Sequence, residues 1–550
     1  MHEALLFRSR RRAIYSVEEL FVVRKLQQIN SNTLLSFYLT VRADTALVVI
    51  LALAHGANAA FGFTSTSKGS KVDTDAGLTF EINKSNGDLI SANYSGIEYQ
   101  GTSRASGINS GLSASAATAG SITGYVKITV KSSGNPDIHY YVAKPKEAII
   151  YMATNNRGEV SPRELRFLAR LKTSELPTGV HGGVGDNRGC TAFEGKDTSK
   201  FSNAQVCMVM PGVAYETLSG GTFMRDINIQ VRTVLGNYMN SGHVRTEDWR
   251  SGLQGPYAVA FTPAGTKPSE SLDTSFFGSL QVGVYVGESG RGSLTGTATG
   301  VSSTFEAVVH WYNAAAEFWT KPQGGNYKSP LMKPGSYTMK LYKGEFLVAT
   351  DSVTVTAGQI TTKDIVSKEA TPSVIWRVGD FGGQPFELKN GDKITRMHPL
   401  DTRMGSWGGS YSVGSSKASH FSVALCSKQS GATTTTVNFQ LTSAQVKAHV
   451  LRIGTTLSSK GGRPIVKIGT WTGSDPGAPI RSLYKSLSKL IDSRGVTRGA
   501  YRGYGEVYTW NVPASAFKEG SNTLTLGVSG SGNSGWLRAN YIVDAVELQD

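Results

Sequence analysis

The amino-acid sequence predicts an all-β protein made of several modules. Short runs rich in Val, Ile, Thr and Tyr recur along most of the chain, separated by Gly, Asn and Ser. Glycine accounts for 63 of the 550 residues, and only 18% of the residues are charged. Short strands with frequent turn residues are typical of β-sandwiches and jelly rolls, and the chain is too long for one hydrophobic core. We therefore expect three β modules behind an N-terminal region.

The first expected module spans residues 60–281 and is interpreted as a large antiparallel β-sandwich. Residues 125–130 alternate between apolar and polar side chains, as a half-buried strand does, whereas the apolar run at 148–153 predicts a more fully buried strand. The sequence Ser-Asn-Gly-Asp at 85–88 has the chemistry of a hairpin turn. An antiparallel sandwich accounts for all three observations.

The second expected module spans residues 282–366. Residues 282–286 predict its first strand, a turn at 333–336 leads into a strand at 337–342, and residues 353–355 close the module. About 85 residues with this many strands fit a small immunoglobulin-like or fibronectin type III-like sandwich.

The third expected module spans residues 372–550, after a polar linker that ends in Pro372. A first strand near 375–379 and a last strand near 541–548 can pair, which favours a jelly roll of the carbohydrate-binding type. The exception to the β pattern is 481–491, where leucines at helical spacing predict a short helix or an inserted loop.

Residues 1–59 are interpreted as a signal-like region that is processed. An apolar run at 45–54 is too short to span a bilayer, and Ala57-Asn58-Ala59 fits signal-peptidase cleavage, so a secreted protein is expected. The forty residues before this run are attributed to a misassigned first exon, and a signal anchor is the alternative. Glycosylation sequons at Asn83 and Asn93 are compatible with secretion.

The net charge and its distribution narrow the classes of binding partner. The formal net charge is +15, the basic residues are scattered, and no zinc-finger spacing or RNP motif is present, which favours an acidic glycan over nucleic acid. A monomer without membrane contact is expected after processing.

The chain has three cysteines. Cys190 and Cys207 form either one bridge or two buried free thiols, and Cys426 is the third.

Motifs along the chain carry a family resemblance. They are residues 164–170 (Glu-Leu-Arg-Phe-Leu-Ala-Arg), 225–228 (Arg-Asp-Ile-Asn), 238–243 (Tyr-Met-Asn-Ser-Gly-His), 252–257 (Gly-Leu-Gln-Gly-Pro-Tyr), 311–313 (Trp-Tyr-Asn), 332–335 (Met-Lys-Pro-Gly), 396–399 (Arg-Met-His-Pro) and 492–499 (Asp-Ser-Arg-Gly-Val-Thr-Arg-Gly). The chain from Ala60 to its end thereby resembles polysaccharide lyase family four, the rhamnogalacturonan lyases of plant-wall-degrading fungi. The resemblance implies a large catalytic β-sandwich, a fibronectin type III-like module and a jelly roll similar to carbohydrate-binding modules. It also implies cleavage between rhamnose and galacturonate in pectin rhamnogalacturonan I by β-elimination, which leaves an unsaturated uronate.

Such an elimination needs a base near the proton beside the uronate carboxylate and a cation that neutralises this carboxylate. By the resemblance, the base is Lys200. A lysine usually has a pKa of about 10.4, and burial or a neighbouring cation lowers it. Arg166 is expected to bind the carboxylate with its planar fork and to tune Lys200. His243 is expected to protonate the departing oxygen or to assist the base, and Tyr238 to bind the sugar.

Each of these residues has a plain structural alternative. Lys200 is a solvated surface residue in that reading, His243 a loop or core histidine, and Tyr238 a core residue. Arg166 alternatively pairs with Glu164 or Asp226. The chain also departs from the family pattern, because Gly236 stands where a tyrosine is expected and the segment around Lys200 is short.

The third module supplies further candidates. Trp376, His398, Trp407 and Tyr504 either contact a sugar or belong to the core. No cofactor is expected to be required for catalysis, but Asp544 resembles a position at which related jelly rolls hold a structural calcium ion, which needs six to eight oxygen ligands.

Two other functions remain open. One is a non-catalytic pectin-binding member of the family, which Gly236 and the short segment around Lys200 favour. The other is a glycoside hydrolase, which needs two carboxylates on opposite sides of the scissile bond. Glu194, Asp197 and Asp226 are acidic residues of the first module, but their spacing singles out no pair.

Overall fold

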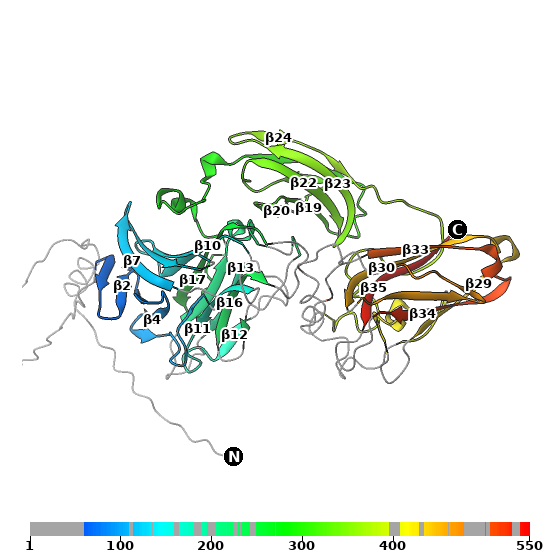
Figure 1. Cartoon of the computed structure of the whole chain (residues 1–550), viewed down its shortest axis with the longest axis horizontal. Coiled ribbons are helices and arrows are strands. Elements are labelled where there is room, and N and C mark those ends of the chain that lie inside the picture. The colour runs from blue at the N-terminus through cyan, green and yellow to red at the C-terminus, as the bar shows by residue number, and fades with distance from the viewer. Residues whose placement is uncertain are drawn as a thin grey trace, which may run out of the picture. The chain divides into compact units, whose positions relative to one another are not determined.

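We describe the chain from a computed structural model (Figure 1), which confirms the all-β prediction. In the residues described, the regular elements are β-strands and short 3-10 helices. The 3-10 helices are η1 (Gly212–Tyr215), η2 (Ser275–Ser279), η3 (Glu288–Gly290), η5 (Ala418–His420), η6 (Ser443–Gln445) and η8 (Ala514–Ala516). The structure describes residues 60–108, 114–134, 136–158, 164–180, 189–194, 204–218, 221–223, 229–230, 233–241, 249–269, 271–394, 408–427, 434–459, 461–477, 501, 506–530 and 539–550.

The first module contains strands β1 to β17 in three sheets. Their orders are β1-β2-β3-β4-β5, β12-β13-β14-β17-β10-β9-β8-β7 and β15-β16-β11-β6. The strands are β1 (Gly62–Ser65), β2 (Gly69–Asp73), β3 (Leu78–Asn83), β4 (Leu89–Tyr94), β5 (Ile97–Glu98), β6 (Gly107–Ile108), β7 (Ala114–Ile122), β8 (Tyr125–Ser132), β9 (Ile138–Ala143), β10 (Ile149–Asn156), β11 (Glu164–Arg170), β12 (Thr178–Val180), β13 (Gly189–Glu194), β14 (Ala204–Met210), β15 (Ile229–Gln230), β16 (Val234–Ser241) and β17 (Gly252–Pro263).

One hydrophobic core joins these three sheets. Phe80 of the first sheet, Tyr257 of the second and Phe167 of the third all belong to it, and each is almost fully buried. The strands predicted at 125–130 and 148–153 are confirmed as β8 and β10, with alternating and nearly continuous burial. The hairpin turn is also confirmed, since Gly87 has φ +72° and donates its N–H to the Asn83 carbonyl between β3 and β4.

The second module is a small sandwich around Trp311, which is completely buried. One sheet has the order β21-β18-β24, with β25 also paired to β18, and the other has the order β20-β19-β22-β23. The strands are β18 (Ser293–Thr299), β19 (Ala307–Tyr312), β20 (Glu317–Thr320), β21 (Asn326–Lys328), β22 (Gly335–Lys343), β23 (Phe346–Val355), β24 (Ile360–Thr362) and β25 (Ile365–Val366).

The strand predicted at 282–286 is wrong. This segment forms turns, in which Val284 has φ +59° and is exposed. Val282 and Tyr285 instead pack beside Phe277 in an apolar cluster of the first module. Local β propensity is overridden here because those two side chains bury against that cluster without a strand partner.

The third module is a two-sheet jelly roll. Its sheets have the orders β26-β35-β30-β33, with β28 also on β35, and β27-β29-β34-β31-β32. The predicted pairing of first and last strands is confirmed, because β26 and β35 run antiparallel with Val378 opposite Val546. The strands are β26 (Val374–Gly379), β27 (Gly409–Ser412), β28 (Ala424–Cys426), β29 (Thr435–Leu441), β30 (His449–Ser459), β31 (Arg463–Ile468), β32 (Trp471–Thr472), β33 (Glu506–Val512), β34 (Gly520–Ser529) and β35 (Asn540–Gln549).

Cys207 is disulfide-bonded and Cys426 is a free, buried thiol. The helix or loop expected at 481–491 lies outside the described residues. A search of the described residues for a helix that is long and apolar enough to cross a membrane finds none.

A buried carboxylate links the first and second modules. Glu216, which follows η1, accepts two hydrogen bonds from the Arg291 guanidinium, at 2.7 and 3.3 Å, and pairs with Lys333 Nζ at 2.9 Å. Its backbone carbonyl accepts the Glu317 N–H at 2.7 Å. Because Glu216 is only 3% exposed, these cations stand in for the water that a carboxylate otherwise binds.

Candidate active site

The strand pair β11–β16 positions the candidate site. On β11, Leu165, Phe167 and Ala169 face the core of the first module. Since side chains alternate along a strand, Glu164, Arg166 and Arg170 lie on the opposite face. The sequence therefore selects a polar face by simple alternation, and β16 supplies the neighbours of that face.

A register shift sets which residues of β16 meet Arg166. Leu165 lies opposite Asn240, whereas Arg166 lies opposite Tyr238, so the pairing skips Met239. An extra residue in one strand changes the direction of its side chains and is common beside functional sites. Here it brings the Tyr238 hydroxyl to Arg166.

Arg166 makes two polar contacts on this face. Its Nη1 donates to the Tyr238 hydroxyl at 3.1 Å and pairs with Glu164 Oε2 at 2.7 Å. The guanidinium also lies 5.4 Å from the centre of the Tyr238 ring, a cation–π distance. Arg166 Nε is buried and has no hydrogen-bond partner among the described residues. The contacts of Nη1 and the ring of Tyr238 thus hold the Arg166 side chain in one orientation.

The structural alternative for Arg166 is therefore partly correct. Of the two acids that the sequence offered, Glu164 pairs with it, and Asp226 lies outside the described residues. The Arg166 side chain still keeps 21% of its surface exposed, while Tyr238 is buried at 3%. Tyr238 is therefore a buried residue that nevertheless turns its hydroxyl toward the charged face.

A second guanidinium reinforces the positive charge of this face. Arg170 Nη1 donates to the Ala105 carbonyl at 2.6 Å. Burial lowers the pKa of Arg170, and the nearby Arg104 and Arg166 lower it further against the opposing effect of Asp88. Burial likewise raises the pKa of Asp88. Two coupled arginines on one strand face suit the binding of an anion.

Gly236 lies two residues before Tyr238, where the family pattern predicts a tyrosine. It pairs with Leu168 of β11, so it sits in the same strand row as the candidate site. Glycine carries no side chain, so this residue itself supplies neither a hydroxyl group nor a ring. The departure noted in the sequence therefore falls directly beside Arg166 and Tyr238.

The structure brings two of the four predicted site residues together, Arg166 and Tyr238. Lys200 and His243 lie outside the described residues. The sequence reasoning did not single out Asn237 and Asn240, which are buried on β16. Polar amides within an otherwise apolar strand are the sequence signal that could have identified them.

In the third module, Trp376 belongs to the core. It is 5% exposed and packs against Phe439, with ring centres 5.3 Å apart. The other aromatic or polar candidates, His398, Trp407 and Tyr504, lie outside the described residues.

Asp544 of β35 is almost fully buried in the third module. Its Oδ2 accepts the Gly383 N–H at 2.9 Å, and its Oδ1 has no hydrogen-bond partner among the described residues. Burial raises the pKa of Asp544 to about 7, and the neighbouring carboxylates of Glu387 and Asp380 act in the same direction.

Comparisons with known proteins cover all three modules. The family model "Rhamnogalacturonan lyase B, N-terminal" matches residues 61–205 and 198–283. Models of domain II and domain III of polysaccharide lyase family 4 match residues 290–363 and 374–548.

Curated relatives align along almost the whole chain. Rhamnogalacturonate lyase A of Emericella nidulans is 43% identical over 524 residues, which cover 90% of this chain and 96% of the relative. The protein of the same name from Aspergillus aculeatus is 43% identical over 90% of this chain and 97% of its own length. A putative rhamnogalacturonase of Neurospora crassa is 41% identical over 92% of this chain and 98% of its own length.

Proposed function

The chain belongs to the rhamnogalacturonan lyases of polysaccharide lyase family 4, and from that premise we propose that it cleaves the rhamnose–galacturonate bond of rhamnogalacturonan I by β-elimination. The observation that carries the proposal is the 43% identity to rhamnogalacturonate lyase A along 90% of the chain. The hydrogen bond by which Tyr238 orients the Arg166 guanidinium supports it.

The proposed reaction follows from the chemistry of a 4-linked uronate. A base takes the proton from C5, the bond between C4 and the rhamnose-linked oxygen breaks, and a C4=C5 double bond forms. The departing oxygen receives a proton and becomes the reducing-end hydroxyl of rhamnose. Charge builds up on the carboxylate during this step, so nearby cations favour the transition state over the ground state.

We assign the roles as follows. Lys200 is the base and His243 assists it or protonates the departing oxygen. Arg166 binds the uronate carboxylate, for which the exposed portion of its planar guanidinium is suited. Tyr238 holds Arg166 through its hydroxyl, and Glu164 pairs with the same nitrogen, Nη1.

The first test measures the product directly. The chain is incubated with debranched rhamnogalacturonan, and the ultraviolet absorbance of the unsaturated uronate is followed, with Lys200→Ala and His243→Ala in parallel. We expect absorbance to rise with the wild type and to be lost with both variants. New reducing ends without a rise in absorbance would mean that the chain is a glycoside hydrolase and not a lyase.

A non-catalytic pectin-binding function is the second candidate. Gly236 favours it, because this position beside Tyr238 lacks the tyrosine of the family pattern. A well-folded wild-type chain that binds rhamnogalacturonan but releases neither unsaturated nor saturated ends would support this candidate against the lyase.

Replacement of Tyr238 by phenylalanine is expected to lower kcat/KM about tenfold, because a hydrogen bond to a charged donor contributes roughly 1.5–3 kcal/mol. The ring stays in place and the strand pairing is kept, so the unfolding midpoint in urea should change little. The same absorbance assay measures the effect. Unchanged kcat/KM would assign the Tyr238 hydroxyl to packing alone.

We propose that the chain acts outside the cell as a monomer on this acidic wall polysaccharide. Its substrate is a plant polymer too large to enter a cell, which supports secretion through the signal-like region at 1–59. Expression from residue 1 in a fungal host, with mass spectrometry of the medium, tests this. An N-terminus at Ala60 is expected, and retention of the chain in the cell membrane would favour a signal anchor.

A structural calcium ion fits the third module only in part. Asp544 offers a buried carboxylate oxygen without a partner, as a ligand would. A search of the described residues finds no group of three or more His, Cys, Asp or Glu side chains that could hold a metal ion. Calcium needs six to eight oxygens, so backbone carbonyls and water would have to complete its shell.

In the absence of calcium, stability is expected to fall by roughly 2–3 kcal/mol between pH 5 and pH 8 because of Asp544. With a pKa of about 7, the folded chain holds a proton that the unfolded chain releases near pH 4, so rising pH favours unfolding. Urea unfolding with EDTA at both pH values measures this fall, which Asp544→Asn should reduce. A fall in stability in the variant equal to that of the wild type would contradict the assignment of this fall to Asp544. If Asp544 also binds calcium, added calcium should stabilise only the wild type at pH 8.

A further inference from the structure

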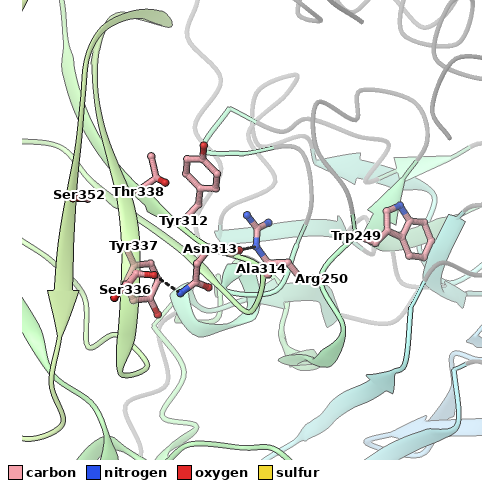
Figure 2. A pocket seen from close by; sticks show the side chains of 9 residues that line it. All are labelled: Trp249, Arg250, Tyr312, Asn313, Ala314, Ser336, Tyr337, Thr338 and Ser352. Atoms are coloured by element: carbon pink, nitrogen blue, oxygen red, sulfur yellow. Dashed lines mark hydrogen bonds between the residues drawn. The ribbon is translucent and has the colours of Figure 1, made fainter. Parts of the chain in front are cut away.

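A pocket whose lining does not include Arg166 or Tyr238 opens beside the second module. Its volume is about 450 Å³, within the range of about 300–1,000 Å³ that small-molecule sites occupy. Tyr312, Ser336, Thr338 and Ser352 line it from the sheet β20-β19-β22-β23 (Figure 2). We refer to it as the Tyr312 pocket.

The floor of the Tyr312 pocket is one row of cross-strand neighbours. Tyr312 of β19 lies opposite Thr338 of β22, and Thr338 lies opposite Ser352 of β23. Figure 2 shows the Tyr312 ring and the Thr338 side chain next to each other on this sheet. The row thus places an aromatic ring beside two hydroxyl groups on a rigid surface.

Two residues of the first module form another part of the lining. Trp249 and Arg250 precede β17, and Trp249 follows His243 by six residues in the chain. The Arg250 guanidinium donates from Nε to the Asn313 carbonyl at 3.0 Å, and from Nη1 to the Leu218 carbonyl. Arg250 therefore fixes this part of the lining to the loop that follows β19.

Lys340, which is not itself one of the lining residues, brings a positive charge next to the pocket. Its Nζ lies 4.6 Å from the centre of the Tyr312 ring, and it has no ion pair with any residue the structure describes. The buried Arg250 is offset by Glu317, 3.7 Å away. His310 adds no charge, because burial, together with Lys340 and Arg250, holds its pKa well below the usual value. The site therefore suits a ligand that carries a negative charge.

These features together match an acidic sugar. Aromatic rings cover the apolar face of a sugar, hydroxyl groups exchange hydrogen bonds with its hydroxyls, and an ammonium pairs with a carboxylate. We propose that the Tyr312 pocket is an accessory subsite that binds a uronate-containing segment of the polysaccharide, with Lys340 pairing its carboxylate. The identity of this ligand rests on the proposed function, whereas the pocket and its charge do not.

The subsite would hold the polymer at a second point, away from the bond that is cleaved. Two linked binding events raise the overall affinity for a long chain without new contacts at either site. Short fragments cannot engage both sites at once, so they should bind the chain twice and independently.

The test counts binding events by isothermal titration calorimetry. The full chain carries Lys200→Ala to prevent turnover, and the probe is a short rhamnogalacturonan oligosaccharide with free carboxylates. Two oligosaccharides per chain are expected, and Thr338→Trp, which fills the pocket, should reduce the number to one. Lys340→Gln should weaken the second event about tenfold, and a carboxyl-reduced probe should lose it.

Matched controls lie on the other sheet of the same module. Thr362 of β24 and Lys328 of β21 are exposed there, so Thr362→Trp and Lys328→Gln should leave both binding events intact. The subsite proposal would be overturned if Thr338→Trp and Lys340→Gln both kept two binding events, or if the parent chain showed a single binding event. Lyase activity is measured separately on the wild type. An inactive chain that loses one event with Thr338→Trp would therefore overturn the proposed reaction and keep the subsite.

Discussion

Replacement of Arg166 by lysine is expected to lower kcat/KM at least about 100-fold on rhamnogalacturonan. A preorganised donor aimed at developing charge typically contributes about 10²–10³ in rate. Arg166 is oriented by Glu164 at 2.7 Å and by the Tyr238 hydroxyl at 3.1 Å, and a lysine ammonium cannot reproduce its planar fork. The absorbance of the unsaturated product measures the loss.

The matched control for this prediction is Arg157→Lys. Arg157 belongs to the same module, its side chain is 72% exposed, and it pairs with Asp137. Its replacement should leave kcat/KM within about twofold. If Arg166→Lys keeps full activity but lowers the urea midpoint, Arg166 serves the fold through Glu164 and does not bind the substrate.

Replacement of Glu216 by alanine is expected to destabilise the chain by about 3–5 kcal/mol, the cost of breaking a buried ion pair. The substitution leaves Arg291, 5% exposed, and Lys333, 15% exposed, without the carboxylate that both contact. Urea unfolding followed by tryptophan fluorescence measures the change. We expect the transition that includes the second module to move to lower urea.

Two further variants test whether the loss of stability comes from breaking the buried ion pairs of Glu216. Glu306→Ala removes a salt bridge to Lys321 in which both side chains are well exposed, and it should cost less than about 1 kcal/mol. Combining Glu216→Leu with Arg291→Met and Lys333→Met should recover much of the lost stability, because apolar groups then replace all three charges of this cluster. A Glu216→Ala variant as stable as the wild type would show that water reaches these cations.

Local patterns in the sequence were sufficient for the strands and for much of the architecture. The alternation at 125–130, the hairpin turn before β4 and the pairing of first and last strands in the third module were all predicted correctly. Each depends on periodicity or turn chemistry, which are properties of neighbouring residues. The family resemblance was likewise carried by short motifs that the sequence displays directly.

Contacts between distant segments were decided only by the tertiary structure. The register that skips Met239 placed Arg166 opposite Tyr238, which is 72 residues away in the chain. Trp376, a candidate for sugar contact, became a core residue through its packing on Phe439.

The sequence by itself determined the all-β class, the family and the polar face of β11. Only the tertiary structure turned the expected strand at 282–286 into turns and placed Trp249 and Tyr312 in the lining of one pocket. The physical reason is that side-chain alternation is set within a few residues. Burial, ion pairing and pockets depend instead on which remote surfaces meet, and no local pattern encodes that choice.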